Sequence, residues 1–276
     1  MLTKELDMQN SNINDAAQLP FDVAAQDKYF KQIEAQLAAV PARPRARSLA
    51  ATVSVSAIRT AQDHDASVVG PSLVVFEEKL SEDDKQDALD SQSFAEAVVR
   101  KLPANSTQEQ RYAAYNEALT AIGWVTESYT RKKYDSKTLT LTMNDALLQI
   151  LQTVISAGSG NVLSLVAAGF EKLKGDKEAL KIVDSGSKNS ELVSFKTVPC
   201  VVAPGGGMAM VMGGLDVYSK NYNGNFLFIT INTEGVQLFQ AAGIRKFNRR
   251  AFDRKRQQVY SYIDKFGDDL FKKLTS

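Results

Sequence analysis

The chain has few of the residues that metal sites and many catalytic sites need. Among 276 residues there is one cysteine, Cys200, and one histidine, His64. A lone cysteine excludes an intramolecular disulfide scaffold. The two residues are also too few for the usual zinc sites, which take several such ligands. The thiol is therefore a core residue, a nucleophile or an attachment point.

The chain also lacks an excess of charge and a long apolar run. The formal net charge of +1 argues against a protein held to nucleic acid by its overall charge, so we expect no nucleic-acid partner. No uninterrupted apolar stretch is long enough for an ordinary transmembrane helix. Acidic and polar residues stand where the apolar core of a signal peptide would lie, so we expect a chain made without one.

The patterning that is present indicates one mixed domain. Residues 1–20 are polar and without period, which predicts a mobile N-terminal arm, and residues 21–276 are expected to form a single domain. Helical spacing and strand-like alternation follow one another without strict βαβ order. The predicted fold class is α+β (mixed α/β), a single compact domain with a mainly antiparallel sheet packed by helices.

Several local features of that fold can be predicted. Ser81, followed by acidic residues, marks a helix start. Residues 124–130 and 137–143 are expected to be two strands that pair with each other around a turn at 132–136. Asn144 is expected to cap the next helix, and residues 248–274 to form one long closing helix.

Cys200 lies in a strand-like apolar run with an unusual continuation. Residues 195–203 precede Gly205, Gly206 and Gly207, and a second apolar run begins at Met208. The glycines have neither the spacing nor the following Lys and Ser/Thr of a phosphate-binding loop. They indicate a tight connection between two buried strands.

One alternative for the thiol is nucleophilic catalysis, as in a cysteine acyltransferase or thioesterase. Cys200 would then need a base, and His64 is the only histidine. His64 is flanked by Asp63 and Asp65, a setting more typical of a solvated turn. This interpretation therefore depends on the fold bringing two distant residues together.

A second alternative is a pore-forming toxin that inserts an apolar hairpin. Residues 145–170 are very apolar but are broken near residues 158–160, and each half is short of the bilayer thickness. Two buried core helices are the simpler interpretation. Residues 206–232 could also insert as a β-hairpin, although they lack the polar alternation of pore-forming hairpins.

A basic segment near the C-terminus admits two interpretations. It could form a membrane-surface patch that meets anionic lipid head groups, at about 1 kcal/mol per basic residue. Alternatively, it is a solvated face paired with the acidic residues 77–90. The residues concerned are Arg245, Lys246, Arg249, Arg250, Arg254, Lys255 and Arg256.

The remaining possibility for Cys200 is S-acylation. A thioester-linked chain needs flexible apolar neighbours that could line a groove of its size. The candidate lining residues are Val198, Val201, Val202, Met208, Met210 and Met212. Taken alone, these residues leave a passive core thiol and an attachment point both open.

The similar length, the α+β pattern and one late cysteine before a glycine-rich apolar run resemble the Erwinia virulence factor (Evf) family. Its members are thought to help bacteria persist in insect guts, and are described as carrying a palmitoyl group in thioester linkage to a late cysteine. The resemblance implies lipid attachment at Cys200, no other cofactor and no metal site. It also implies a non-enzymatic virulence or insecticidal role at host gut-cell membranes.

The same resemblance bears on partners and location. It implies a fatty acyl chain or membrane lipid as partner, together with a possible host gut-cell target. Such a protein would be made in the bacterial cytoplasm and would then be membrane-associated or released to act outside the cell.

Overall fold

The computed structural model describes most of the chain between residues 21 and 272. The described ranges are 21–39, 57–58, 65–135, 140–155, 160–189, 192–218, 227–228, 230–232 and 236–272. The predicted arm at residues 1–20 and His64 lie outside them.

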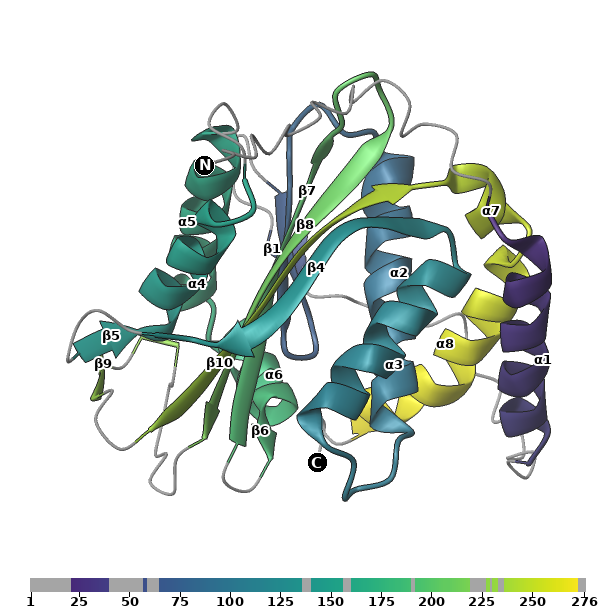
Figure 1. Ribbon diagram of the computed structural model, residues 1–276, viewed down its shortest axis with the longest axis horizontal. Helices are drawn as coiled ribbons and strands as arrows, with labels where there is room; N and C mark the ends of the chain where they lie inside the picture. Colours follow the sequence, from purple (N-terminus) through teal and green to yellow (C-terminus); the bar gives the residue numbers. More distant parts are fainter. Residues whose placement is uncertain are drawn as a thin grey trace, which may run out of the picture.

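A single large sheet organises the described part of the chain (Figure 1). Its strands follow the order β1-β2-β3-β7-β8-β10-β4, and β6 pairs with the start of β7. A separate two-stranded ladder joins β5 to β9. The strands are β1 (Ala57–Ile58), β2 (Asp65–Val69), β3 (Ser72–Phe76), β4 (Trp124–Lys133), β5 (Thr140–Thr142), β6 (Lys188–Asn189), β7 (Leu192–Val202), β8 (Met208–Tyr218), β9 (Thr230–Asn232) and β10 (Gln237–Phe247).

The sheet is antiparallel at every described pairing except one. The exception joins β3 to β7, in parallel register. Side chains of β3 are buried on both faces, which suits a strand paired in the sheet interior. This arrangement confirms the predicted α+β class with a mainly antiparallel sheet.

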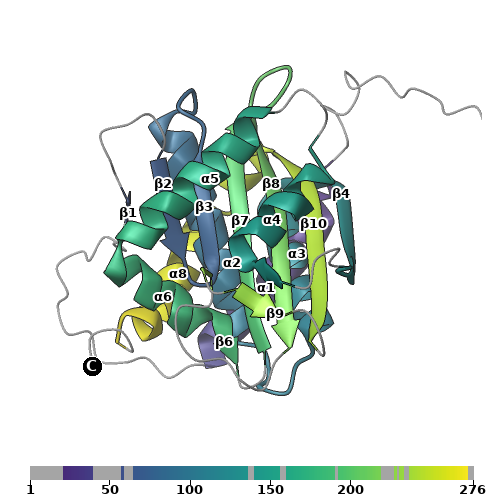
Figure 2. The ribbon, with the colours of Figure 1, turned by 90° about the vertical axis from the view of Figure 1, so that its left-hand side faces the viewer.

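Helices cover both faces of the sheet (Figures 1 and 2). In Figure 2, α4 and α5 cross in front of the strands, with α6 beside them. On the other face α2 and α3 form an inner layer, and α1 and α8 lie outside it. The helices are α1 (Val23–Ala39), α2 (Glu82–Arg100), α3 (Gln108–Ala121), α4 (Met143–Gln152), α5 (Gly160–Gly175), α6 (Lys177–Ser187), α7 (Arg249–Asp253) and α8 (Arg256–Lys272).

Strand alternation divides the interior into two cores. Along a strand, successive side chains point to opposite faces, so Val198 and Cys200 of β7 face α2 and α3, whereas Phe195 faces α4 and α5. We call these the α3 face and the α4 face. The apolar segment 145–170 supplies helices that pack on the α4 face, as expected for buried core helices. No helix within the described ranges is both long and apolar enough to cross a bilayer.

Two helices of the α3 face begin at clear capping residues. Ser81 caps α2, where its hydroxyl accepts a hydrogen bond from the Asp84 amide. Thr107 caps α3 through a capping box with Gln110. In both cases a side-chain oxygen satisfies an amide that has no partner inside the helix.

Three local predictions were wrong. The strands at 124–130 and 137–143 do not pair with each other, because β4 pairs with β10 and β5 pairs with β9. The cap of α4 is Thr142 rather than Asn144. The closing helix is divided into α7 and α8 by a turn at residues 254–255.

Candidate functional site

Cys200 lies near the end of β7 on the α3 face and is fully buried. It stands in a row that crosses the sheet from strand to strand. Phe76 of β3 pairs with Cys200, Cys200 with Met210 of β8, and Met210 with Arg245 of β10. Paired residues of adjacent strands point to the same face, so thiol, thioether and guanidinium occupy consecutive places on one buried surface.

The setting of the thiol keeps it protonated. Burial raises the pKa of Cys200 well above its usual range. Its sulfur contacts the Val198 carbonyl oxygen at 3.8 Å, and no basic side chain of the described ranges bonds to it. A nucleophilic cysteine needs the opposite environment, one that favours the thiolate. The expected partner of the catalytic alternative, His64, lies outside the described residues.

The six residues expected to line an acyl chain do not share one surface. Val198, Met208, Met210 and Met212 lie with Cys200 in the α3-face core. Val201 instead packs against the α4-face core, and Val202 is 37% exposed. The expectation of one six-residue groove is therefore corrected, because strand alternation turns Val201 away and Val202 lies at the open end of β7.

The triple glycine forms the connection between β7 and β8. Gly205, Gly206 and Gly207 all have positive φ, at 89°, 93° and 78°. Residues with a Cβ rarely adopt this conformation, which explains three glycines in succession. The Ala203 amide donates to the Gly207 carbonyl across the turn, at 2.9 Å. The predicted tight connection is confirmed.

Most of the basic segment is held by acidic residues of α2 and its neighbours. Arg249 forms ion pairs with Asp84 and, at 3.1 Å, with Asp87. Arg256 also binds Asp87, and Lys255 pairs with Asp27. Lys246 pairs with Glu127 on β4, and the Arg254 guanidinium lies over the Phe21 ring. Arg250 remains exposed.

Arg245 departs most from its expected place. Only 3% of it is exposed, so it lies inside the protein and not on a surface patch. The reason is its position within β10, where alternation directs it to the α3 face. Burial lowers the pKa of its guanidinium.

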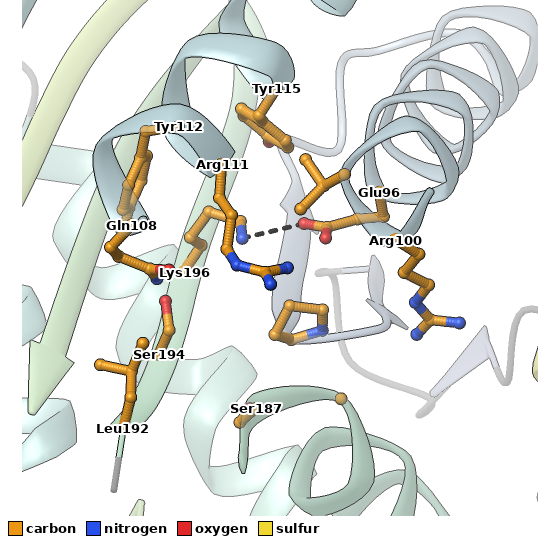
Figure 3. Close-up of a pocket in the computed structure, with 13 residues that line it drawn as sticks. Glu96, Arg100, Gln108, Arg111, Tyr112, Tyr115, Ser187, Leu192, Ser194 and Lys196 are labelled. Atoms are coloured by element: carbon orange, nitrogen blue, oxygen red, sulfur yellow. Dashed lines mark ion pairs between the residues drawn. The ribbon is translucent and has the colours of Figure 1, made fainter. Parts of the chain in front are cut away.

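A polar cavity of about 110 Å³ lies between α2, α3 and the start of β7 (Figure 3). At its centre the Lys196 ammonium binds the Glu96 carboxylate at 2.9 Å, and both side chains are almost completely buried. The Ser72 hydroxyl also donates to Glu96, at 3.1 Å. Arg100 and Arg111 contribute two further cationic side chains to the lining.

Asp216 of β8 is the acceptor at the centre of a second buried network. Its carboxylate accepts hydrogen bonds from Ser194 at 2.7 Å, Gln108 at 3.1 Å and Tyr112 at 3.3 Å. It also forms an ion pair with Arg131 of β4 at 2.9 Å. Through these contacts one carboxylate fixes α3 and β4 against β7 and β8.

A larger and more apolar cavity, of about 510 Å³, lies between α1, α3 and β4. Its lining residues are Phe21, Asp22, Ala25, Gln26, Tyr29, Asn116, Glu117, Thr120, Ala121, Trp124, Val125, Thr126, Tyr129 and Arg245. Sequence reasoning missed both cavities. The only signal for this one was the aromatic character of its lining, which is indistinguishable in sequence from ordinary core.

The buried thiol and tyrosine hydroxyls on the α3 face predict a loss of stability at high pH. Burial raises the pKa of Tyr112 and Tyr115 well above the usual range, as it does for Cys200. A group whose pKa is raised on folding contributes stability that is complete below its unfolded-state pKa and is lost progressively as the pH rises from that value towards the folded-state pKa. In free-thiol protein, we expect the free energy of unfolding to fall above about pH 8.5 from the thiol, and more steeply above about pH 10 from the tyrosines.

Urea denaturation at a series of pH values measures this loss, with Cys200→Ala as the matched control. The variant should delay the onset until the tyrosines titrate, because it removes the group with the lowest unfolded-state pKa. Identical pH profiles for parent and variant would contradict the assignment.

Comparison with known proteins gives structural likeness alone. No family model matches the chain, and no curated protein matches it. The Cyt2Ba monomer from Bacillus thuringiensis subsp. israelensis is similar over 63% of this chain and 97% of its own, with 12% identity and a TM-score of 0.40. A delta-endotoxin is similar over 75% of this chain and 89% of its own, with 12% identity and a TM-score of 0.36.

The third similar structure is that of the Evf virulence factor. The match spans 87% of this chain and 89% of the Evf chain, with 10% identity and a TM-score of 0.36. The resemblance to Evf that the sequence indicates is therefore also found between the structures. At this level of overlap, the three structures assign no role to any residue of this chain.

Proposed function

We propose that this protein is a non-enzymatic virulence or insecticidal factor, S-palmitoylated at Cys200 and acting at host gut-cell membranes. The observation that carries the proposal is that the sole cysteine is fully buried in an apolar core, which it shares with Met208 and Met210. That environment suits a finished thioester, which carries no ionisable proton, better than it suits a reactive thiolate. Because forming the thioester needs an accessible thiolate, we place the acylation before folding buries Cys200.

The neighbours of Cys200 could accommodate an acyl chain by changing rotamer. Methionine side chains are unbranched and adaptable, and three of them face the same core as the thiol. Burying a palmitoyl chain is worth about 0.8 kcal/mol per CH₂, or roughly 10 kcal/mol in total. This gain has to exceed the cost of opening space for the chain, because Cys200 lines neither of the two cavities described above.

If the acyl chain instead left the core and entered a membrane, the protein would need a second attachment signal. One acyl chain alone gives only marginal and reversible anchoring. The basic segment is less available for this role than its composition suggests, since Arg249 and Arg256 are bound to Asp87. Arg250 and Arg254 are the exposed members that remain for lipid head groups.

The structure weighs against the enzyme alternative and against a pore formed by residues 145–170. A cysteine acyltransferase or thioesterase requires an accessible thiolate, and Cys200 is neither accessible nor disposed to ionise. A pore formed by residues 145–170 would require α4 and α5 to leave the α4-face core, where their apolar residues are buried.

Intact-mass measurement tests the acylation. Protein from the cells that make it naturally should carry a palmitoyl-sized adduct that neutral hydroxylamine removes, because hydroxylamine cleaves thioesters. Cys200→Ala protein from the same cells is the control and should carry no adduct. An unmodified mass for the parent protein, or an adduct that persists in Cys200→Ala, would show that Cys200 is not the attachment site.

A further inference from the structure

The cavity of about 510 Å³ has the size of a small-molecule site. Ligand pockets in proteins are commonly about 300–1,000 Å³, with apolar walls and a few polar groups that orient the ligand. Here the walls include the rings of Phe21, Tyr29, Trp124 and Tyr129. Trp124 is itself held in place by Phe247, with ring centroids 4.7 Å apart.

The polar groups of this lining include hydrogen-bond donors that lack acceptors. Trp124 is fully buried and its indole N–H has no partner. The hydroxyl of Tyr29 is likewise buried without a partner, and among the described residues that of Tyr129 has only the Asn116 side chain near enough to bond. A buried donor left unpaired costs about 1–3 kcal/mol. The indole N–H and the Tyr29 hydroxyl are closed off even from water, so an occupant that supplies acceptors reaches them only if neighbouring side chains move.

Arg245 adds a buried positive charge to the same cavity. Its guanidinium donates to Asn116 Oδ1 at 2.8 Å and to Thr120 Oγ1 at 3.4 Å, both neutral acceptors. No carboxylate within the described ranges forms an ion pair with it, in contrast to Arg131, which binds Asp216. The acidic residues of the lining, Asp22 and Glu117, are exposed to solvent.

We propose that this cavity binds an amphipathic carboxylate, with the carboxylate on Arg245 and the apolar body between the aromatic rings. A guanidinium matches a carboxylate with two parallel hydrogen bonds. The carboxylate also has lone pairs to accept hydrogen bonds from nearby N–H and O–H groups. A cationic ligand would meet the buried charge of Arg245, and a neutral one would leave that charge uncompensated.

This inference stands apart from acylation at Cys200. Met210 lies between the Cys200 and Arg245 positions in the row across the sheet, and Cys200 is not part of the cavity lining. The proposed ligand is bound without a covalent link. Binding can therefore be measured in a Cys200→Ala background, where acylation plays no part.

Trp124 reports binding directly, since it is the only tryptophan of the chain. We expect decanoate to change its fluorescence in a saturable way at neutral pH, and decanol to bind at least tenfold more weakly, a difference of about 1.4 kcal/mol. Arg245→Met keeps a side chain of similar reach without the charge and should remove that preference. Arg250→Met, at an exposed arginine of the same segment, should retain it.

A second pair of variants keeps the test valid if Arg245→Met does not fold. Ala25 lines the cavity from the exposed side of α1, and Ala24 is exposed beside it without lining the cavity. Ala25→Phe should weaken decanoate binding at least tenfold, whereas Ala24→Phe should leave it unchanged. Equal affinities for decanoate and decanol in the parent, or full binding by Ala25→Phe, would overturn the proposal.

Discussion

Replacing Asp216 by alanine is expected to lower the free energy of unfolding by about 3–5 kcal/mol. The substitution removes the acceptor that Arg131, Ser194, Gln108 and Tyr112 share. Arg131 would then lose its buried counter-ion and keep only Glu109, which is largely exposed. The donors left unpaired add their own desolvation cost.

Urea denaturation of parent and variant at neutral pH measures this loss. Asp216→Asn tests the charge separately, because the amide keeps the shape and one acceptor oxygen; we expect an intermediate loss. Glu178→Gln is the surface control, since its ion pair with Lys181 is exposed and worth under about 1 kcal/mol. If Asp216→Ala cost no more than this control, the network would contribute nothing to stability.

The second large effect concerns the buried pair of Lys196 and Glu96. Glu96→Gln leaves the Lys196 ammonium buried without a counter-ion, beside the Tyr115 ring at 5.0 Å. Removing one partner of a buried pair typically costs about 3–5 kcal/mol. We expect the same range for Lys196→Met, which leaves Glu96 with the Ser72 hydroxyl as its remaining donor.

The double variant separates the pair from its parts. Replacing both residues, as Glu96→Gln with Lys196→Met, removes both buried charges, and buried pairs replaced in this way often cost little or nothing. We therefore expect the double variant to be more stable than either single variant, as measured by thermal and urea unfolding. Additive losses would mean that the two side chains contribute independently.

The elements with strong local signals could be predicted from the sequence. The connection of β7 to β8 through the glycines was predicted, because two apolar runs flank three glycines in succession, and glycine readily adopts the positive φ of a tight turn. The start of α2 was equally clear, since Ser81 is followed by acidic residues and does cap the helix. In both places the local preference and the tertiary fold agree.

Strand partners could not be predicted, because they depend on the whole sheet. β4 and β5 are close in sequence and both alternate, which favours a hairpin. Instead β10 arrives from the far end of the chain and pairs along the full length of β4. Long-range pairing of this kind leaves no mark on the composition of the strand.

Of the candidate site residues, only some could be recognised from the sequence, for a similar reason. Cys200 is conspicuous as the sole cysteine, whereas Arg245 looked like one of several surface cations. Its burial follows from the register of β10, and Lys246, one residue later, is bound at 2.6 Å by Glu127 of β4. A shift of one residue exchanges the two faces of a strand, so only the observed register identifies the buried cation.

The parallel contact between β3 and β7 has a consequence for the newly made chain. β3 leaves the ribosome more than a hundred residues before β7, a delay of roughly 10 s at ordinary synthesis rates. During that time the edge of β3 that will pair with β7 has no native partner, although β2 can already pair with the other edge. The exposed strand carries the apolar residues Leu73, Val74 and Val75. Unpaired strand edges of this kind promote aggregation, so we expect nascent chains to need a chaperone until β7 emerges.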